Sequence, residues 1–210
     1  MTALACVLFD LDGVLVHYDH ETRVRLLAAC SGTAEADVMA ALFDSGLEQD
    51  ADLGSYDAEQ QANELSLRLG ATVTLADCLD SRAASMTADD AMVTLATQVS
   101  QRATVAILSN NGWLVRDHLG TLCPPLMPLF AGRVFCSAEF GVAKPDPAVF
   151  SRCVAKLGLI PKAVLFIDDK VVNVDGARIA GLRVHHYRDI ATPSALLHEL
   201  DLPEPDHVET

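Results

Sequence analysis

The stretch VLFDLDGV (residues 7–14) places two aspartates and a glycine directly after an apolar run. An apolar run without polar alternation is typical of a strand that is buried on both faces of a parallel sheet. Asp10 and Asp12 are two residues apart, so on a continuing strand their side chains would point the same way. Gly13 permits the sharp turn that would aim both carboxylates into a cleft. The stretch therefore predicts a buried strand that ends in paired carboxylates.

Four further apolar runs have the same character, and helical patterns lie between most of them. This succession predicts an α/β fold, a Rossmann-like parallel sheet core with helices on both faces. Two of the connecting helices are predicted at residues 87–102 and 148–157. The five predicted strands are Ala5–Phe9, Ala103–Leu108, Val134–Cys136, Ala163–Ile167 and Leu182–His185.

The first two predicted strands are separated by an unusually long stretch of sequence. A crossover between parallel strands needs about 30 residues, but several times that number separate Asp10 from the end of the second strand. The extra segment shows helical signals only, with predicted helices at 21–30, 34–45, 57–69 and 74–84, and Asp57 and Thr74 as N-caps. We expect a small all-helical cap (lid) domain at 16–84 and an α/β core at 1–15 and 85–210, with a loose tail at 202–210.

Composition narrows the possible functions. Half of the residues are hydrophobic (50%) and 21% are charged, as in an ordinary globular protein, and the net charge is −14. Nucleic acid and anionic membranes both require a basic face, so we expect neither as a partner. The six cysteines form no C-x-x-C pair, and no signal peptide pattern precedes Asp10. These features favour buried thiols and a cytoplasmic protein.

Polar residues follow the predicted strands at the edge where ligands bind in parallel sheets. Several carboxylates collected there would repel one another unless a cation joined them. Oxygen ligands without a cysteine or histidine cluster favour Mg²⁺. The residues concerned are Asp10, Asp12, Ser109, Asn110, Lys144, Asp168 and Asp169.

These residue types suit phosphoryl transfer. A carboxylate can attack phosphorus to form an aspartyl phosphate, and a second carboxyl group can protonate the leaving oxygen and later take a proton from water. Lys144, the hydroxyl of Ser109 and loop N–H groups could hold the oxygens of the phosphate.

The motifs together resemble those of the haloacid dehalogenase superfamily in its phosphatase branch. They appear in order as residues 9–14, 108–110, 144–147 and 167–169, and further matching features extend to Gly181. The resemblance implies that Asp10 is the nucleophile and Asp12 the general acid and base. It also implies that Ser109, Lys144 and the backbone amide of Asn110 bind phosphate. The implied Mg²⁺ ligands are Asp10, the backbone carbonyl of Asp12, Asp168 and Asp169, with Asp168 acting directly or through water.

The resemblance thus implies a Mg²⁺-dependent phosphatase of small phosphate monoesters, with sugar phosphates among the candidates. A phosphomutase or a haloacid dehalogenase of the same superfamily is an alternative, although dehalogenases lack the second aspartate that Asp12 supplies. A phospho-receiver domain is disfavoured by the order of the motifs and by the long gap after Asp10. We expect a small phosphorylated metabolite as the partner, and a monomer or a homodimer.

Other residues have two interpretations. His17, Tyr18 and His20 could line the substrate cleft or belong to a solvated linker, and Trp113 could face the cleft or pack against its own helix. Asn173 is expected to support the acidic loop by hydrogen bonding.

Overall fold

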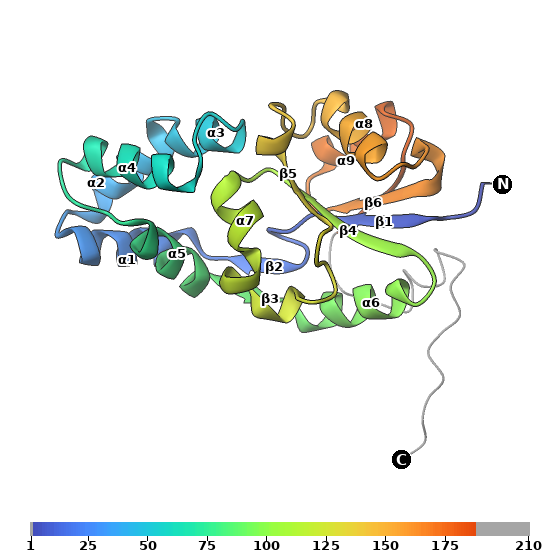
Figure 1. Cartoon of the computed structure of the whole chain (residues 1–210), viewed down its shortest axis with the longest axis horizontal. Coiled ribbons are helices and arrows are strands. Elements are labelled where there is room, and N and C mark those ends of the chain that lie inside the picture. Colours follow the sequence, from blue (N-terminus) through green and yellow to red (C-terminus); the bar gives the residue numbers. More distant parts are fainter. Residues whose placement is uncertain (1, 188–210) are drawn as a thin grey trace, which may run out of the picture.

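The computed structural model describes residues 2–187 (Figure 1). The predicted tail at 202–210 lies outside these residues. A five-stranded parallel sheet forms the centre of the molecule, in the order β5-β4-β1-β6-β7. Each predicted strand is confirmed to within one residue at either end. The strands are β1 (Cys6–Phe9), β4 (Thr104–Ser109), β5 (Val134–Cys136), β6 (Val164–Asp168) and β7 (Arg183–His186).

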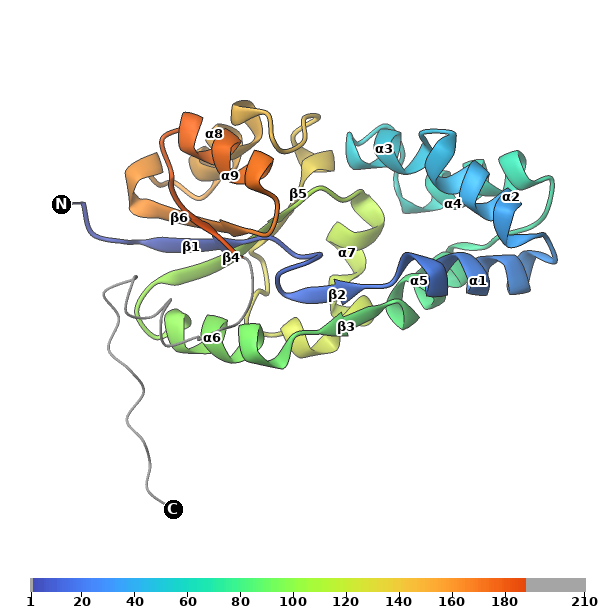
Figure 2. The ribbon, with the colours of Figure 1, turned by 180° about the vertical axis from the view of Figure 1, so that it is seen from behind.

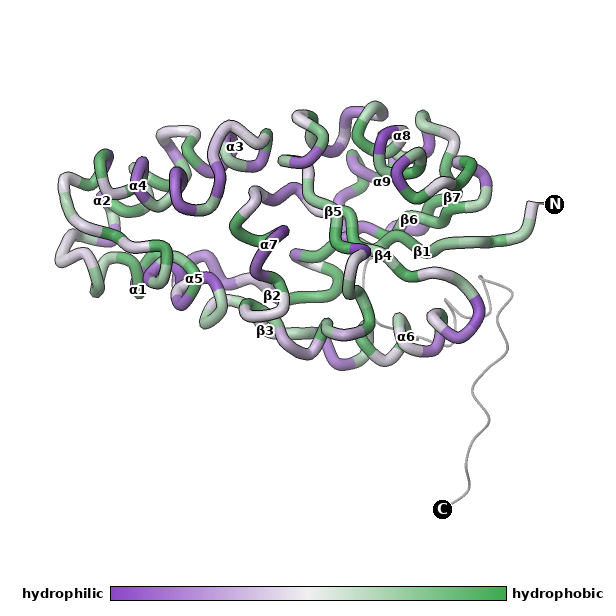
Figure 3. The backbone as a smooth tube through the Cα atoms, in the orientation of Figure 1, coloured by the Kyte–Doolittle hydropathy of each residue, from purple (hydrophilic) through white to green (hydrophobic). Residues whose placement is uncertain are grey.

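The central strand β1 is buried on both faces. Val7 and Phe9 belong to one hydrophobic cluster, whereas Cys6 and Leu8 belong to a second cluster on the opposite face. Successive side chains of a strand point to opposite faces, so both faces of β1 require apolar residues. Figure 3 shows the resulting hydrophobic colouring along β1 and β4. This explains why the first apolar run has no polar alternation.

Helices cover both faces of the sheet, as predicted. Apolar residues of α6 and α7 pack in the cluster that contains Val7, and those of α8 and α9 pack in the cluster that contains Leu8. The helices are α6 (Asp90–Ser100), α7 (Trp113–Leu122), α8 (Pro147–Lys156) and α9 (Val171–Ile179), with short 3₁₀ turns η2 (Pro124–Leu126), η3 (Ser137–Glu139) and η4 (Pro161–Ala163).

A group of helices lies beyond the carboxyl ends of the sheet strands (Figures 1 and 2). Asp57 with Gln60, and Thr74 with Asp77, form the predicted capping boxes at the starts of α4 and α5. The predicted helix at 34–45 is divided into α2 and a π-helical segment η1, and α3 was not predicted. The elements are α1 (His20–Ser31), α2 (Glu35–Met39), η1 (Ala40–Asp44), α3 (Leu47–Asp52), α4 (Ala58–Leu69) and α5 (Leu75–Ala84).

The two connections between these helices and the sheet form an antiparallel ribbon, β2 (Val16–Tyr18) with β3 (Met86–Ala88). The prediction of helical structure alone at 16–84 was wrong here, as was the start of the next helix at Thr87. That helix begins at Asp90, because Asp89 caps it by accepting hydrogen bonds from two backbone amides. Because the two connecting segments run side by side, their backbone N–H and C=O groups form hydrogen bonds with each other as β2 and β3. The division into domains at 16–84 remains a prediction.

Within residues 2–187 no single helix is long and apolar enough to cross a membrane, although α1 and the helical stretch at 35–52 meet that criterion jointly as a pair bent by 114°. The six cysteines are free thiols, and all except Cys30 are buried.

Candidate active site

The predicted site residues gather at the carboxyl edge of the sheet. Asp10 follows β1, Ser109 ends β4 and Asp168 ends β6, and these strands are neighbours in the sheet. Lys144 lies in the loop that leads from β5 to α8. Four segments that are distant in the sequence therefore meet at one place.

Lys144 bridges two carboxylates at the centre of this edge. Its ammonium nitrogen Nζ lies 2.7 Å from Asp10 Oδ1 and 2.8 Å from Asp168 Oδ2. All three residues are buried, with 5%, 4% and 0% of their surfaces exposed for Lys144, Asp10 and Asp168. Buried charges are tolerated only when they are paired and hydrogen-bonded. One ammonium nevertheless leaves two carboxylates with an excess of negative charge.

The pKa values reflect this imbalance. Burial, opposed by Lys144 and reinforced by the charge of Asp168, raises the pKa of Asp10 to about 7. Burial also opposes ionisation of Asp168, but Lys144 and the hydrogen bonds that Asp168 accepts hold its pKa below the usual value. Asn173 Nδ2 donates two of these bonds, at 3.0 and 3.1 Å, and the backbone amide of Lys170 donates another at 2.8 Å. The supporting role predicted for Asn173 is confirmed.

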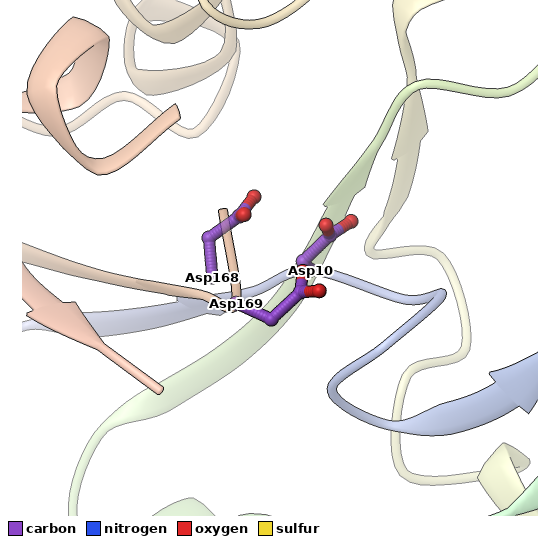
Figure 4. A group of neighbouring side chains, drawn as sticks. All are labelled: Asp10, Asp168 and Asp169. Carbon is purple, nitrogen blue, oxygen red and sulfur yellow. The ribbon is translucent and has the colours of Figure 1, made fainter. Parts of the chain in front are cut away.

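A third carboxylate completes the cluster. Oxygen atoms of Asp10, Asp168 and Asp169 lie within 4.8 Å of one another (Figure 4). Asp169 Oδ1 is buried and receives no hydrogen bond within residues 2–187. A Cβ atom on Gly13, where φ is +93°, would lie 2.8 Å from Asp169 Oδ2, so glycine leaves room for this carboxylate. Three converging carboxylates, one with an unpartnered oxygen, fit a hard divalent cation.

Asp12 lies apart from this carboxylate cluster. Arg82 Nη2 donates hydrogen bonds to both carboxylate oxygens, at 2.9 and 2.7 Å, and Asn111 Nδ2 donates a third at 3.0 Å. The side chain of Asp12 is therefore not a member of the three-carboxylate group. The role predicted for its backbone carbonyl as a metal ligand remains a prediction.

Sequence reasoning missed Arg82 and Asn111. Arg82 lies on α5, four residues after the buried Cys78, and its own side chain is 1% exposed. A charged residue on the apolar face of a helix indicates a buried ion pair, and this signal was present in the sequence. Its partner could not be read from the sequence, because Asp12 lies 70 residues away.

Asn110 and Ser109 occupy distinct positions in the same loop. The side chain of Asn110 holds the Lys144 segment, since Nδ2 donates to the carbonyl of Lys144 and Oδ1 accepts from its amide, both at 2.8 Å. The buried hydroxyl of Ser109 accepts a hydrogen bond of 2.8 Å from Asn111 Nδ2. Asn110 thus has a structural role in addition to the predicted one at its backbone amide.

A cavity of about 400 Å³ adjoins Lys144 on the side of the helical region. His20 lines it, and its ring contacts Tyr18 and Phe43 at centroid distances of 4.1 and 5.2 Å. The side chain of His17 is 76% exposed and lies near Asp89. The full lining is His20, Phe43, Glu48, Gln49, Asp52, Leu53, Asn110, Ala143 and Lys144.

Comparisons with known proteins are consistent with this arrangement. Over 81 residues the chain is 37% identical to Phosphatase MT3486 of Mycobacterium tuberculosis (strain CDC 1551 / Oshkosh), a match that spans 39% of this chain and 37% of that protein. A HAD family enzyme from Bacteroides thetaiotaomicron, solved with magnesium and inorganic phosphate, has a TM-score of 0.78 and 19% identity, covering 92% of this chain and 99% of its own.

The L-2-haloacid dehalogenase of Xanthobacter autotrophicus has a TM-score of 0.62 and 22% identity, covering 94% of this chain and 82% of its own. At these identities, the two solved structures establish a shared fold. The model of the haloacid dehalogenase-like hydrolases matches residues 4–181. The order of the motifs, the parallel sheet and the carboxylate cluster agree with that match, and the chain belongs to the haloacid dehalogenase-like hydrolase family.

Proposed function

We propose that this hydrolase is a Mg²⁺-dependent phosphatase that cleaves small phosphate monoesters through an aspartyl phosphate on Asp10. The observation that carries the proposal is the pair Asp10 and Asp12, two carboxyl groups in different surroundings. Asp10 lies against Lys144, whereas Asp12 is held by Arg82 and Asn111. Two nearby carboxyl groups in unlike environments can take the separate roles of nucleophile and acid–base.

In the first step, an oxygen of Asp10 attacks phosphorus while the bond from phosphorus to the leaving oxygen breaks. Asp12 gives its proton to that oxygen. In the second step, Asp12 takes a proton from water as the water oxygen attacks phosphorus, and the carboxylate of Asp10 is released together with inorganic phosphate. A dehalogenase has no need of such a proton donor, so the presence of Asp12 favours phosphoryl transfer.

The remaining site residues would stabilise the phosphoryl group. Lys144 supplies a positive charge beside Asp10, and the hydroxyl of Ser109 lies at the end of the adjacent strand. Asp10, Asp168 and Asp169 would hold Mg²⁺, which when bound supplies positive charge to the phosphate oxygens. The related mycobacterial phosphatase and the magnesium and phosphate complex of the Bacteroides enzyme support this choice of metal and substrate.

The cavity beside Lys144 has a volume suited to a small metabolite, and the net charge of −14 disfavours a nucleic-acid substrate. Cytoplasmic localisation and a monomeric or homodimeric state remain predictions.

The test measures phosphate release from p-nitrophenyl phosphate with Mg²⁺ and with EDTA, and chloride release from 2-chloropropionate. We expect Mg²⁺-dependent phosphate release and no chloride release. Asp10→Asn should abolish phosphate release while the circular dichroism spectrum and melting temperature show a folded protein. Normal phosphate release by folded Asp10→Asn, or chloride release by the wild type, would overturn the proposal. Conversion of one sugar phosphate into another without phosphate release would indicate a phosphomutase.

A further inference from the structure

The lining of the cavity beside Lys144 indicates which kind of alcohol is esterified to the phosphate of the substrate. This inference rests on the proposed phosphatase function. Asn110, Ala143 and Lys144 form its side next to the catalytic edge of the sheet. The opposite side comes from α1, η1 and α3 and the loop that follows, and includes Glu48 and Asp52. A phosphate held at Lys144 would direct its ester group toward these helices.

The end of α3 is fixed firmly above the sheet. Ser137 Oγ donates a hydrogen bond of 2.6 Å to the backbone carbonyl of Asp52. Close by, a Cβ atom on Gly54 would lie 2.4 Å from the carbonyl oxygen of Ala138, so only glycine permits this approach of the two backbones. Asp52 is therefore held in place at the cavity wall by backbone contacts that do not depend on its carboxylate.

The two acidic residues of the cavity wall differ in their partners. Glu48 accepts hydrogen bonds from Arg23, at 2.6 and 3.3 Å, and from Gln61 at 3.1 Å. Within residues 2–187 the carboxyl group of Asp52 has no hydrogen bond or ion pair, and only burial and the charges of nearby groups act on it. Burial, followed by the charge of Glu48, raises the pKa of Asp52 to about 8, and the opposing charges of Arg82 and Arg23 do not offset this increase.

No free cation faces this part of the cavity within residues 2–187. Lys144 is engaged by Asp10 and Asp168. The two nearby arginines are paired as well, Arg23 with Glu48 and Arg82 with Asp12.

His20 does not supply the missing charge. Burial, followed by the charges of Arg82 and Arg23, lowers its pKa below the ordinary value of 6.5, so the ring is mainly neutral at pH 7. A second anionic group on the substrate would thus meet carboxyl groups without a compensating charge.

We propose that the substrate is the phosphate ester of an uncharged polyol and that Asp52 determines this specificity. Asp52 accepts a hydrogen bond from a hydroxyl group of the substrate and disfavours phosphate esters that carry a carboxylate. Gln49, Asn110 and His20 add neutral hydrogen-bonding groups to the same cavity, which suit hydroxyl groups spaced along a short chain. Phe43 supplies an apolar face for the carbon atoms.

The experiment is done at about pH 9, above the raised pKa of Asp52, so that its carboxyl group is ionised. It compares kcat/KM for glycerol 3-phosphate and 3-phosphoglycerate, which differ only by a hydroxymethyl group in place of a carboxylate. The wild type should prefer glycerol 3-phosphate by about tenfold or more. Asp52→Asn removes the charge with little change of shape and should bring the two values within about threefold of each other. Asp50→Asn is the matched control, because Asp50 lies on the same helix, is exposed and does not line the cavity. It should keep the wild-type preference.

The outcomes separate this inference from the proposed function. The inference would be overturned if the wild type preferred 3-phosphoglycerate, or if Asp52→Asn and Asp50→Asn showed the same ratio of kcat/KM for the two esters. Phosphate release from p-nitrophenyl phosphate in the same preparations would still support the phosphatase function. Higher kcat/KM for O-phosphoethanolamine than for glycerol 3-phosphate would also overturn it, since the cavity would then select an ammonium group. Absence of phosphate release from every ester would overturn the proposed function.

Discussion

Arg82 Nη2 lies 2.7 Å from Asp12 Oδ2, although 70 residues separate them in the sequence. Arg82 belongs to α5, and Asp12 to the loop after β1. The guanidinium group also packs against the ring of Tyr18, 3.6 Å from its centroid. Arg82 thus fixes the side chain of the proposed acid–base from the helical region beyond the sheet.

Replacement of this arginine tests its positioning role. We expect Arg82→Gln to lower kcat/KM for glycerol 3-phosphate by about 100-fold, because Asp12 would no longer be held where it can protonate the leaving oxygen. The loss of kcat/KM for p-nitrophenyl phosphate should be much smaller, because nitrophenolate leaves without protonation and kcat/KM does not include the later hydrolysis of the aspartyl phosphate. Steady-state kinetics with both esters provide the measurement.

The control is Arg82→Lys, which retains a cation and should recover part of the activity on glycerol 3-phosphate. Equal losses on both esters would show that Arg82 acts in some way other than through Asp12.

Lys144 should be essential for the stability of the metal-free protein. Lys144→Met leaves Asp10 and Asp168 buried without their common cation, which we expect to cost about 3–5 kcal/mol of unfolding free energy. Lys156→Met provides a comparison, because the Lys156 side chain is 48% exposed and pairs with Glu139, which also lies near Arg116. The unfolding free energy of Lys156→Met should fall by at most about 1 kcal/mol. Urea unfolding in EDTA measures both, and similar losses would contradict the importance of the buried bridge.

Gly13 should be required for the carboxylate cluster. The methyl group of Gly13→Ala would contact the carboxylate of Asp169, in addition to the strain of a positive φ. We expect a loss of about 1–3 kcal/mol in stability together with weaker Mg²⁺ binding. Gly32→Ala has a similar positive φ but no neighbouring atom within 4 Å, so it should show the backbone strain alone. Calorimetric titration with Mg²⁺ distinguishes the two, and equal affinities would refute the steric argument.

Asp52 should make the stability of the protein depend on pH. Burial and the charges of Glu48 and Asp12 raise its pKa in the folded state to about 8, against the opposing effect of Arg82 and Arg23, from an ordinary value of 3.8. Between about pH 4 and pH 8 the folded protein keeps the proton on Asp52, whereas the unfolded chain has released it. Proton binding by Asp52 therefore stabilises the folded state at low pH, and this stabilisation is lost as pH rises. Asp52→Asn cannot ionise and should gain stability relative to the wild type as pH rises from about 5 to about 9.

Melting temperatures across this pH range provide the measurement. Asp50→Asn, at an exposed position of the same helix, should follow the wild-type curve. A constant difference between Asp52→Asn and the wild type at all pH values would show that the carboxyl group of Asp52 titrates normally.

Local sequence patterns were sufficient for the sheet and for the motif residues on it. Strands such as β1 are short and apolar throughout because both faces are covered, and that requirement is visible within a few residues. Parallel strands also bring their carboxyl ends to one edge, so the proximity of Asp10, Ser109 and Asp168 followed from the fold class alone. The β2–β3 ribbon could not be found this way, since each of its strands has only three residues and its partner is distant.

Periodicity, helix caps and motif order are properties of neighbouring residues, so the amino-acid sequence was enough to predict the α/β sheet, the capped helices and the polar residues at the carboxyl edge of the sheet. The folded structure was needed to show that Arg82 and Asn111 hold Asp12, that Asn110 fastens the Lys144 loop, and that Asp52 lines the cavity without a paired cation. These contacts join segments far apart in the chain. They depend on how the helical region packs above the sheet, and no local pattern encodes that packing.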